Sequence, residues 1–285
     1  MASKTNIEKT LCIQSGAEKS TIEKLDGKSY RVTHATRRGN SRFYFSDNVQ
    51  IVKSRAAACR LALSLVNPIT AALFNGLCMN HTGKMTDVIS FSTYCGLNPR
   101  CIERMKDGNS VCAACFAARQ MKRQKSTREK LIKNTEIITA TVYSPALFPI
   151  IPGDMLRLEA FGDLVNDIQA ANYISWAAIN KHALVALWTK NPDILWKGFE
   201  KIGFNKPKNL NVIFSSPRLN SPSDNMRKLY IMPDGKPMID KIFTVYTKKY
   251  IQENNIIANC GARSCRGCKR CYKKSTGVHV REILK

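Results

Sequence analysis

From Asp87 onward the chain alternates between short apolar runs and longer segments of helical composition. The runs are nearly continuous rather than alternating, as expected for strands buried on both faces of a parallel sheet. The five expected strands are Val88–Ser92, Met155–Phe161, Leu184–Trp188, Leu210–Phe214 and Ile242–Tyr246. Five such units favour an α/β fold that forms a partial or distorted (β/α) barrel of mostly parallel strands. A doubly wound open sheet is the alternative, because periodicity does not distinguish a closed sheet from an open one.

Helical signals fill the segments between these runs. Asn166–Lys181 carries apolar residues at roughly helical spacing, and Pro192 opens a further helix where its missing N–H does no harm. Cys112–Asn134 has helical composition with many long charged side chains, and Ser221–Leu229 is a shorter candidate. Strands separated by such segments indicate a parallel sheet.

The first 80 residues show no lasting alternation, although Ser29–Thr33 and Arg42–Phe45 are candidate short strands. The most apolar stretch, Ala57–Met79, is interrupted by polar residues and a proline, so it predicts two buried segments around a turn instead of a membrane span. We therefore expect three parts: an N-terminal extension packed on the core (residues 1–86), an α/β core with a cysteine loop (residues 87–255) and a C-terminal cysteine-rich, metal-binding segment (residues 256–285).

Composition narrows the class of protein. The 285 residues are 44% hydrophobic, which is enough for a core and excludes a disordered basic tail. The polar N-terminus lacks the apolar run of a signal peptide, and no stretch reaches the roughly 20 apolar residues that span a bilayer. We therefore expect a cytoplasmic protein with no membrane partner.

The chain is strongly basic, with 45 Lys and Arg against 21 Asp and Glu and a formal net charge of +24. Basic residues crowd the helical segment after Cys115, namely Arg119, Lys122, Arg123, Lys125, Arg128, Lys130 and Lys133. Lys269–Lys274 adds a second cluster. Such density favours contact with the phosphates of nucleic acid or a nucleotide, and the alternative is a solvated face that only aids solubility. Sequence-specific readout is not expected, because no helix-turn-helix or RNA-binding signature occurs.

Eight of the 11 cysteines fall into two groups of four. The first group is Cys95, Cys101, Cys112 and Cys115, and the second group is Cys260, Cys265, Cys268 and Cys271. The odd total and the lack of an export signal favour metal or redox roles over disulfides.

The second group has four, two and two residues between its successive cysteines. Two-residue spacers let adjacent thiolates converge on one metal centre, and the glycines between them permit the necessary turns. The spacing leaves the metal open. A structural zinc needs four thiolates, and a ferredoxin-like run of one four-residue and one two-residue spacer also occurs here.

The first group begins after the first expected strand and ends at the start of a helix. In α/β proteins the chemistry lies in such loops, beyond the carboxyl ends of parallel strands. Three thiolates on a four-iron cluster would leave one iron open to a substrate or cofactor, whereas four would close it. The alternative is a zinc knuckle that fixes a long loop.

Three charged residues near the strand ends are further candidates. Asp163 either holds a polar group of a cofactor or substrate, or caps the helix that begins near Asn166. Lys190 either reaches into a pocket as a donor to phosphate or carboxylate, or is a solvated strand end. Glu159 alternates with apolar residues in an expected buried strand, so it needs a partner such as Arg157 or Lys190.

Several motifs, taken in order, resemble the phage "gene product 88" family. They are Cys112-Ala-Ala-Cys-Phe-Ala-Ala-Arg-Gln-Met-Lys, Asn134, Leu156-Arg-Leu-Glu-Ala-Phe-Gly-Asp-Leu and Ala186-Leu-Trp-Thr-Lys190. The similarity includes Asn209–Ser216 and the closing cysteine run, and it covers roughly residues 87–272. No motif is highly specific alone, and their order carries the resemblance.

That family is similar in turn to radical S-adenosylmethionine (SAM) barrels, where a cysteine loop after the first strand binds a four-iron cluster and a Gly-rich end of the second strand meets the methionine amino group. The resemblance aligns Cys112 and Cys115 with the closing cysteine pair and Gly162-Asp163 with that strand end. The usual three-cysteine run is absent, because ten residues separate Cys101 from Cys112.

The resemblance implies a phage-encoded iron–sulfur protein, with one or two 4Fe-4S clusters, that acts in the host cytoplasm. It further implies SAM binding and an enzyme that acts on nucleic acid or a nucleotide. The alternative is a zinc-stabilised, basic nucleic-acid-binding protein without catalysis. A third interpretation is purely structural, with both cysteine groups only fixing loops.

Overall fold

The computed structural model describes residues 11–15, 18–25, 30–36, 45–52, 67–79, 83–151, 153–261 and 263–284. The chain forms two compact units, of which the first comprises residues 1–75 and 143–150 and the second comprises residues 76–142 and 151–285. Both cysteine groups belong to the second unit. The candidate chemistry is therefore confined to that unit.

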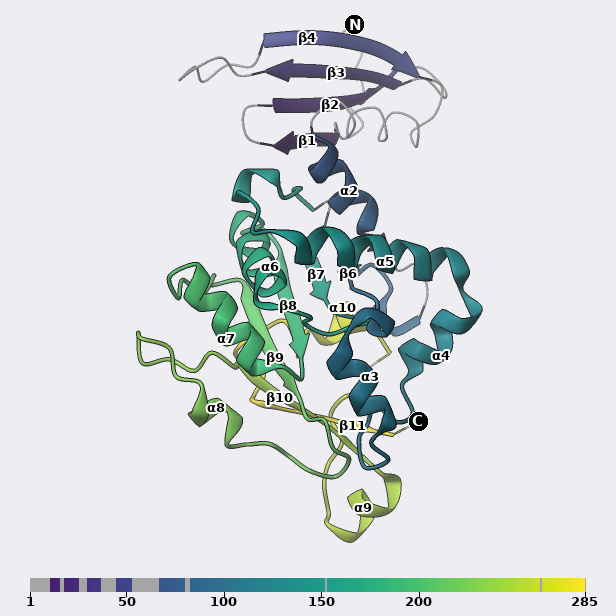
Figure 1. The fold of residues 1–285 in the computed structure, drawn as a ribbon, viewed down its shortest axis with the longest axis vertical. Coiled ribbons are helices and arrows are strands. Elements are labelled where there is room, and N and C mark those ends of the chain that lie inside the picture. The colour runs from purple at the N-terminus through teal and green to yellow at the C-terminus, as the bar shows by residue number, and fades with distance from the viewer. Residues whose placement is uncertain are drawn as a thin grey trace, which may run out of the picture. The chain divides into compact units, whose positions relative to one another are not determined.

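The first unit contains a four-stranded antiparallel sheet (Figure 1). Its strands lie in chain order: β1 (Leu11–Ser15), β2 (Glu18–Lys24), β3 (Tyr30–Thr36) and β4 (Phe45–Val52). Ser20 and Ile22 of β2 are buried, as is Val32, which pairs with Ile22 across the sheet. The predicted strand Ser29–Thr33 corresponds to β3 from Tyr30 onward. The predicted strand Arg42–Phe45 lies outside the described residues except for Phe45, where β4 begins.

The apolar stretch that predicted two buried segments contains one described helix, α2 (Pro68–Gly76). Asn67 caps this helix, because its side-chain oxygen accepts a hydrogen bond from Ile69 N at 2.8 Å. The first of the two predicted segments, at residues 57–66, lies outside the described residues.

The second unit is built on a seven-stranded sheet with the order β11-β10-β9-β8-β7-β6-β5. Its strands are β5 (Cys78–Met79), β6 (Ile89–Phe91), β7 (Met155–Leu158), β8 (Leu184–Thr189), β9 (Leu210–Ser215), β10 (Lys241–Tyr246) and β11 (His279–Ile283). β5 is antiparallel to β6, and the six strands from β6 to β11 are parallel. The five strands expected from the apolar runs are β6 to β10, so the predicted α/β class with mostly parallel strands is confirmed.

The six parallel strands lie side by side in the order in which they occur along the chain. A doubly wound sheet would instead reverse its order at a switch point. The helices α6 (Asp167–Ile179) and α7 (Pro192–Lys201) connect β7 to β8 and β8 to β9, and they pack together on one face of the sheet (Figure 1). Gly198 permits this packing, because an added Cβ would lie 2.4 Å from the Cβ of Ala170. The sheet from β6 to β10 is therefore singly wound.

Two helical predictions are wrong in part. The segment Cys112–Asn134 belongs to two helices, α4 (Phe116–Arg123) and α5 (Lys125–Ala140), because Gln124 between them has a ψ of 80°. Within Ser221–Leu229 only α8 (Met226–Leu229) is an α-helix. The remaining short helices are α3 (Pro99–Lys106), α9 (Lys248–Glu253) and α10 (Cys265–Cys268).

The two faces of the sheet have different coverings. On the helix face, the ring of Phe91 contacts Tyr173 and Trp176 of α6, with centroids 6.1 and 5.0 Å apart. On the opposite face, the C-terminal segment packs on a buried cluster of Val88, Met155, Ala186, Ile213, Phe243, Tyr272 and Val280. The connection from β10 to β11 therefore packs, through Tyr272 and its cysteines, on the face opposite α6 and α7.

Candidate metal centres

The first cysteine group lies in the loops at the carboxyl end of β6. After β6 the chain forms a 3-10 turn, η2 (Cys95–Leu97), whose first residue is buried, and then α3, which contains Cys101. Cys112 lies in the next turn, and Cys115 is the N-cap residue of α4. Because β6, β7 and β8 are parallel, the loops after all three strands reach the same edge of the sheet.

A sulfur–sulfur hydrogen bond joins the first and last cysteines of this group. The bond from Cys95 lowers the pKa of Cys115 to about 6 against the effect of burial, and the amides of Ala118 and Ala117 in the first turn of α4 lower it further. The same bond, together with burial, raises the pKa of Cys95. The interaction therefore makes Cys115 the more acidic thiol of the pair.

Electrostatic interactions connect the remaining cysteines to this pair. Cys101 interacts with both Cys95 and Cys112, so the four residues form one group. Burial raises the pKa of Cys101 and nearby Asp163 raises it further, whereas the charge of Lys190 opposes both. The ammonium of Lys190 also helps to lower the pKa of Cys115. Lys190, predicted as a donor at a strand end, thus adds positive charge beside the thiols.

Asp163, which is 3% exposed, ties the loop after β7 to the end of β8. Its carboxylate accepts hydrogen bonds from Leu164 N at 2.8 Å, Thr189 Oγ1 at 2.7 Å and Lys190 N at 3.1 Å. Arg104 Nη1 lies 3.6 Å from its Oδ2 atom. The carboxylate is therefore occupied in fixing two loops of the carboxyl edge.

The interpretation of Asp163 as a helix cap is wrong. The cap of α6 is Asn166, whose side-chain oxygen accepts a hydrogen bond from Gln169 N at 2.9 Å. Asn166 immediately precedes the first helical residue, so its side chain reaches the free amides of the first turn, whereas Asp163 lies further back along the chain.

Glu159 is buried next to the first cysteine loop, on the helix side of the sheet. A positive φ of 60° at Glu159 ends the strand alternation and turns its side chain away from Arg157 and toward α6. The carboxylate accepts hydrogen bonds from Thr93 N at 3.2 Å, Thr93 Oγ1 at 3.0 Å, Gln169 Nε2 at 2.7 Å and the hydroxyl of Tyr173. The prediction of a basic partner is therefore wrong. Burial raises the pKa of Glu159 to about 7, although the bonds from Tyr173 and Thr93 oppose the shift.

Gly162 lies where the loop after β7 meets the first cysteine loop. An added Cβ would lie 2.5 Å from Thr93 Oγ1 and 2.6 Å from both Thr93 O and Glu159 Oε2. The close packing of these two loops therefore leaves no room for a side chain.

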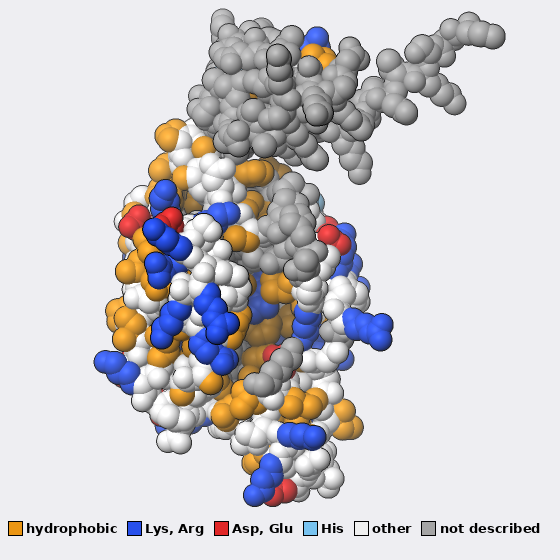
Figure 2. All heavy atoms as spheres, turned by 90° about the vertical axis from the view of Figure 1, so that its right-hand side faces the viewer, with side chains coloured by type: hydrophobic (Ala, Val, Ile, Leu, Met, Phe, Trp, Pro, Cys, Tyr) orange, Lys and Arg blue, Asp and Glu red, His pale blue; other side chains and the backbone are white. Residues whose placement is uncertain are grey.

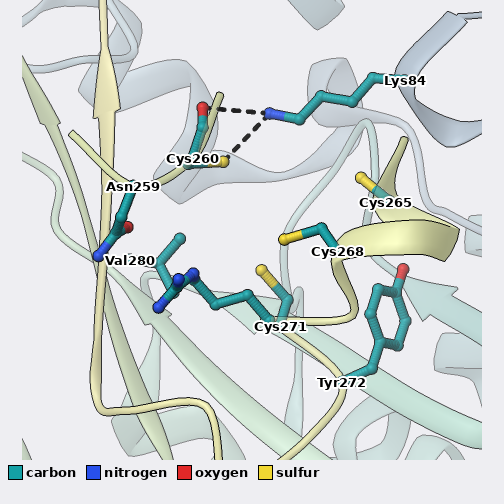
Figure 3. A pocket seen from close by; sticks show the side chains of 9 residues that line it. Lys84, Asn259, Cys260, Cys265, Cys268, Cys271, Tyr272 and Val280 are labelled. Carbon is teal, nitrogen blue, oxygen red and sulfur yellow. Dashed lines mark hydrogen bonds between the residues drawn. The ribbon is translucent and has the colours of Figure 1, made fainter. Parts of the chain in front are cut away.

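The second cysteine group lines one pocket on the sheet face opposite α6. Figure 3 shows the side chains of Cys260, Cys265, Cys268 and Cys271 pointing toward one another across this pocket. Two of them lie in α10, which Ser264 caps by accepting a hydrogen bond from Gly267 N at 3.3 Å. Lys269, with a φ of 52°, then turns the chain toward the last cysteine. Local turn chemistry thus brings three of the four thiols together.

Charged side chains from several strands and from the segment before β6 surround the second group. Lys84, which precedes β6, places its Nζ atom 3.1 Å from Cys260 Sγ and 3.3 Å from Glu282 Oε1. Burial opposes the charge of Lys84, but these two partners raise its pKa to about 12. Burial raises the pKa of Cys271 to about 12, against the charge of Arg157. The second group therefore lies on a face of the sheet, whereas the first lies in loops at its carboxyl edge.

Buried polar atoms without a hydrogen-bond partner lie beside both groups. Five buried side-chain atoms of the described residues have no hydrogen-bond partner: Arg104 Nη1, Arg157 Nε, Trp188 Nε1, Asn211 Oδ1 and Arg270 Nε. The first belongs to a residue that interacts with Cys101, and the other four lie beside the second group. An unpaired buried group costs about 1 to 3 kcal/mol. The three N–H donors beside the second group fit an additional anionic partner there, whereas Arg104 Nη1 is ion-paired with Asp163.

Among the described residues, no group of three or more His, Cys, Asp or Glu side chains is arranged closely enough to hold a metal ion. The sulfur atoms face one another without forming a complete coordination shell. The identity of a metal at either group, and its presence, stay predictions.

Compared with known proteins, the chain matches no family model, no curated protein and no solved structure. The resemblance to the phage family and to radical SAM barrels therefore rests on the sequence motifs alone.

The two predicted basic clusters differ in whether their side chains are exposed or already bonded to neighbouring residues. Arg119, Lys122, Arg123 and Lys125 are exposed on α4 and at the start of α5. In the second basic cluster, by contrast, Lys274 lies 3.7 Å from Asp240 and Arg270 donates to Thr276 O. Figure 2, which views the second unit from the side of α4, shows Lys and Arg side chains gathered beside a hollow with a hydrophobic floor. No helix within the described ranges is long and apolar enough to cross a membrane.

Sequence reasoning missed three residues that adjoin the cysteines. Arg104 lies three positions after Cys101 in the same helix, and that spacing could have identified it. Lys84 and Trp188 carry no such signal, because only the folded sheet brings them near a segment that follows much later in the chain.

Proposed function

We propose that this protein is an iron–sulfur protein with a radical-SAM-like partial barrel that acts on nucleic acid or a nucleotide. The first cysteine group is its reactive centre, and the second has a mainly structural duty. One observation carries the proposal: four cysteines and Lys190 meet at the carboxyl edge of a singly wound parallel sheet. Barrel enzymes build their active sites at this edge.

The strand order supports the partial barrel. A barrel places consecutive strands side by side and its helices on the outer face, which matches β6 to β11 with α6 and α7. The inner face of such a barrel would be the one on which the C-terminal segment packs.

The donor set supports a cluster at the first group. Cys95, Cys101, Cys112 and Cys115 would hold it, and three of them would suffice to leave one iron open. When bound, a four-iron cluster supplies one-electron chemistry. The chain itself contributes the lowered pKa of Cys115 and the nearby positive charge of Lys190, which favour an anionic centre.

Among the predicted SAM-binding residues, Gly162 and Asp163 fix the loop after β7 and offer no free side chain to a ligand. Gly162 has no space for a side chain, and the Asp163 carboxylate already accepts three hydrogen bonds. Lys190 is the one whose side-chain charge acts on the cysteines. It is therefore the best candidate to bind the carboxylate or phosphate of a ligand.

Metal analysis tests the proposal. Protein purified without oxygen should be brown and contain iron and acid-labile sulfide, and Cys112→Ser with Cys115→Ser should lose the share that belongs to the first group. Colourless protein with stoichiometric zinc would contradict the cluster.

The second candidate function is a zinc-stabilised nucleic-acid-binding protein without catalysis. The short cysteine helix α10, its capping serine and the following left-handed turn favour zinc at the second group. The exposed basic residues of α4 support binding to nucleic acid. Zinc in both groups, with no iron, would select this function.

A further inference from the structure

Three of the exposed large hydrophobic residues adjoin the first cysteine group. Leu97 is 46% exposed, Ile102 is 38% exposed and Phe116 is 57% exposed, and each follows a cysteine of the group by one or two positions. Single apolar residues on a surface are ordinary, but three around one site indicate a contact surface.

Phe116, the aromatic residue among these three, packs on a second aromatic ring. Phe116 is the first residue of α4, and its ring packs at a tilt of 44° on the ring of Phe161, with centroids 5.7 Å apart. The backbone of Phe161 is fixed in turn, because its N–H donates to Ser92 Oγ at 3.3 Å. An exposed ring on a rigid support loses little entropy when a flat ligand stacks on it.

Positive charge continues from this ring along α4. Arg119, Lys122 and Arg123 are exposed on the helix that begins with Phe116, and Lys125 follows at the start of α5. An exposed aromatic ring combined with a row of cationic side chains is the pattern that binds single strands. The bases stack on the ring, while Lys and Arg pair with the phosphates.

We propose that Phe116, supported by Phe161, is a stacking platform for an unpaired base of a single-stranded nucleic acid, and that the basic side chains of α4 contact its phosphates. The strand would then pass beside the first cysteine group. The inference rests on the proposed function, whose substrate class it narrows to single strands, although the binding itself needs no cluster. A duplex keeps its bases stacked on one another and offers no free base face to the ring.

Fluorescence anisotropy of the full-length protein tests the platform. The probes are a fluorescein-labelled oligothymidylate and the same strand paired with oligodeoxyadenylate. The single strand should bind more tightly than the duplex. Phe116→Ala should weaken single-strand binding by about five- to a hundredfold, as expected for the loss of one base–aromatic stack, and Phe116→Tyr should keep most of it.

Matched control variants distinguish stacking on Phe116 from nonspecific hydrophobic binding and from nonspecific electrostatic binding. Ile257→Ala removes another exposed apolar side chain, which is 77% exposed, and it should leave binding unchanged. Lys122→Glu with Arg123→Glu should weaken binding more than Lys248→Glu with Lys249→Glu, which reverses two adjacent exposed charges on α9. Equal losses from the two charge reversals would overturn the assignment to α4.

Other outcomes would overturn the platform itself. They are equal binding of duplex and single strand, no effect of Phe116→Ala, no nucleic-acid binding at low salt, or binding of an acidic peptide as tight as that of the oligonucleotide. Iron and sulfide are measured on the same preparations. If the protein contains no iron but Phe116→Ala still weakens single-strand binding, the cluster proposal is wrong and the stacking platform stands. If the protein contains iron but Phe116→Ala has no effect, the platform is wrong and the cluster proposal stands.

Discussion

The two cysteine groups have the same number of thiols and opposite surroundings. The first lies in loops at the carboxyl edge of the sheet, where a hydrogen bond from Cys95 lowers the pKa of Cys115 to about 6. The second lies on the sheet face, in the connection that leads into β11, where burial raises the pKa of Cys271 to about 12. Exposed apolar residues surround the first, whereas buried strand residues surround the second.

This contrast teaches that the number of thiols does not define the role of a cysteine group. Residues in loops at the carboxyl edge can be substituted while the strands of the sheet stay paired. A connection that carries the last strand has no such freedom, because disturbing it detaches β11. We therefore expect the second group to govern stability and the first to govern activity.

The largest expected effect concerns the cysteines themselves. Cys271→Ser should lower the free energy of unfolding by about 3 kcal/mol or more, because metal binding at a structural site is coupled to folding. Cys115→Ser should cost about 1 kcal/mol and abolish any cofactor-dependent activity. Urea unfolding without oxygen, combined with metal analysis, measures both. If the two variants lose stability and metal to the same extent, the division of duties is wrong.

The next effect is a pH dependence that originates beside the first group. Glu159 ionises near pH 4.5 in the unfolded chain and near pH 7 in the folded protein. Between these values the unfolded chain releases the proton first, so stability should fall by about 2 to 3 kcal/mol as the pH rises and level off above pH 7. The Glu159→Gln variant should lack this slope. Denaturation curves recorded from pH 4.5 to 8 measure it, and an unchanged slope in the variant would assign the dependence elsewhere.

A pair of glycines provides a smaller and sharper comparison. Gly162→Ala should destabilise the protein by about 1 to 3 kcal/mol, because the new Cβ meets Thr93 and Glu159 at 2.5 to 2.6 Å. Gly267→Ala, in the second group, should change stability by less than about 0.5 kcal/mol, since the nearest atom is 4.0 Å away. Thermal unfolding of both variants tests the contrast. Equal losses would show that the first loop is less tightly packed than its distances indicate.

The smallest effect on stability should come from the basic surface. Reversing Lys122, Arg123 and Lys125 to Glu should change the free energy of unfolding by no more than about 0.5 kcal/mol for each exposed residue and leave the metal content unchanged. The same variant should flatten the salt dependence of nucleic-acid binding by about one unit for each lost phosphate contact. Titrations at several salt concentrations give the slope. A slope equal to that of the unaltered protein would place the phosphate contacts on another surface.

The core strands were predictable because burial on both faces leaves a plain signal. β6 to β10 are short apolar runs, and each was expected in its place. β11 escaped notice, since only Val280 within it is fully buried and Arg281 and Glu282 separate its two apolar residues. The strands of the first unit are equally polar. In β2, for example, Ser20 and Ile22 are buried among charged neighbours.

From the sequence, only those site residues that lie close together along the chain were predictable. Spacing identified the eight cysteines, because neighbouring ligands are encoded within short runs. Lys84 reaches both Cys260 and Glu282 from a distant part of the chain, and no local pattern encodes those contacts. Glu159 misled strand reasoning for a different reason, since one left-handed residue moved its side chain to the other face of the sheet.

The crossing from β10 to β11 bears on the order in which the chain folds. Each of the strands β7 to β10 pairs with its immediate predecessor, so the sheet can grow strand by strand as the chain leaves the ribosome. The last strand must instead wait for a connection that packs on the other face of the sheet. Metal captured by the second group would hold that connection in place. Maturation would then end with metal delivery, and protein made under metal starvation would pair β5 to β10 and leave β11 undocked.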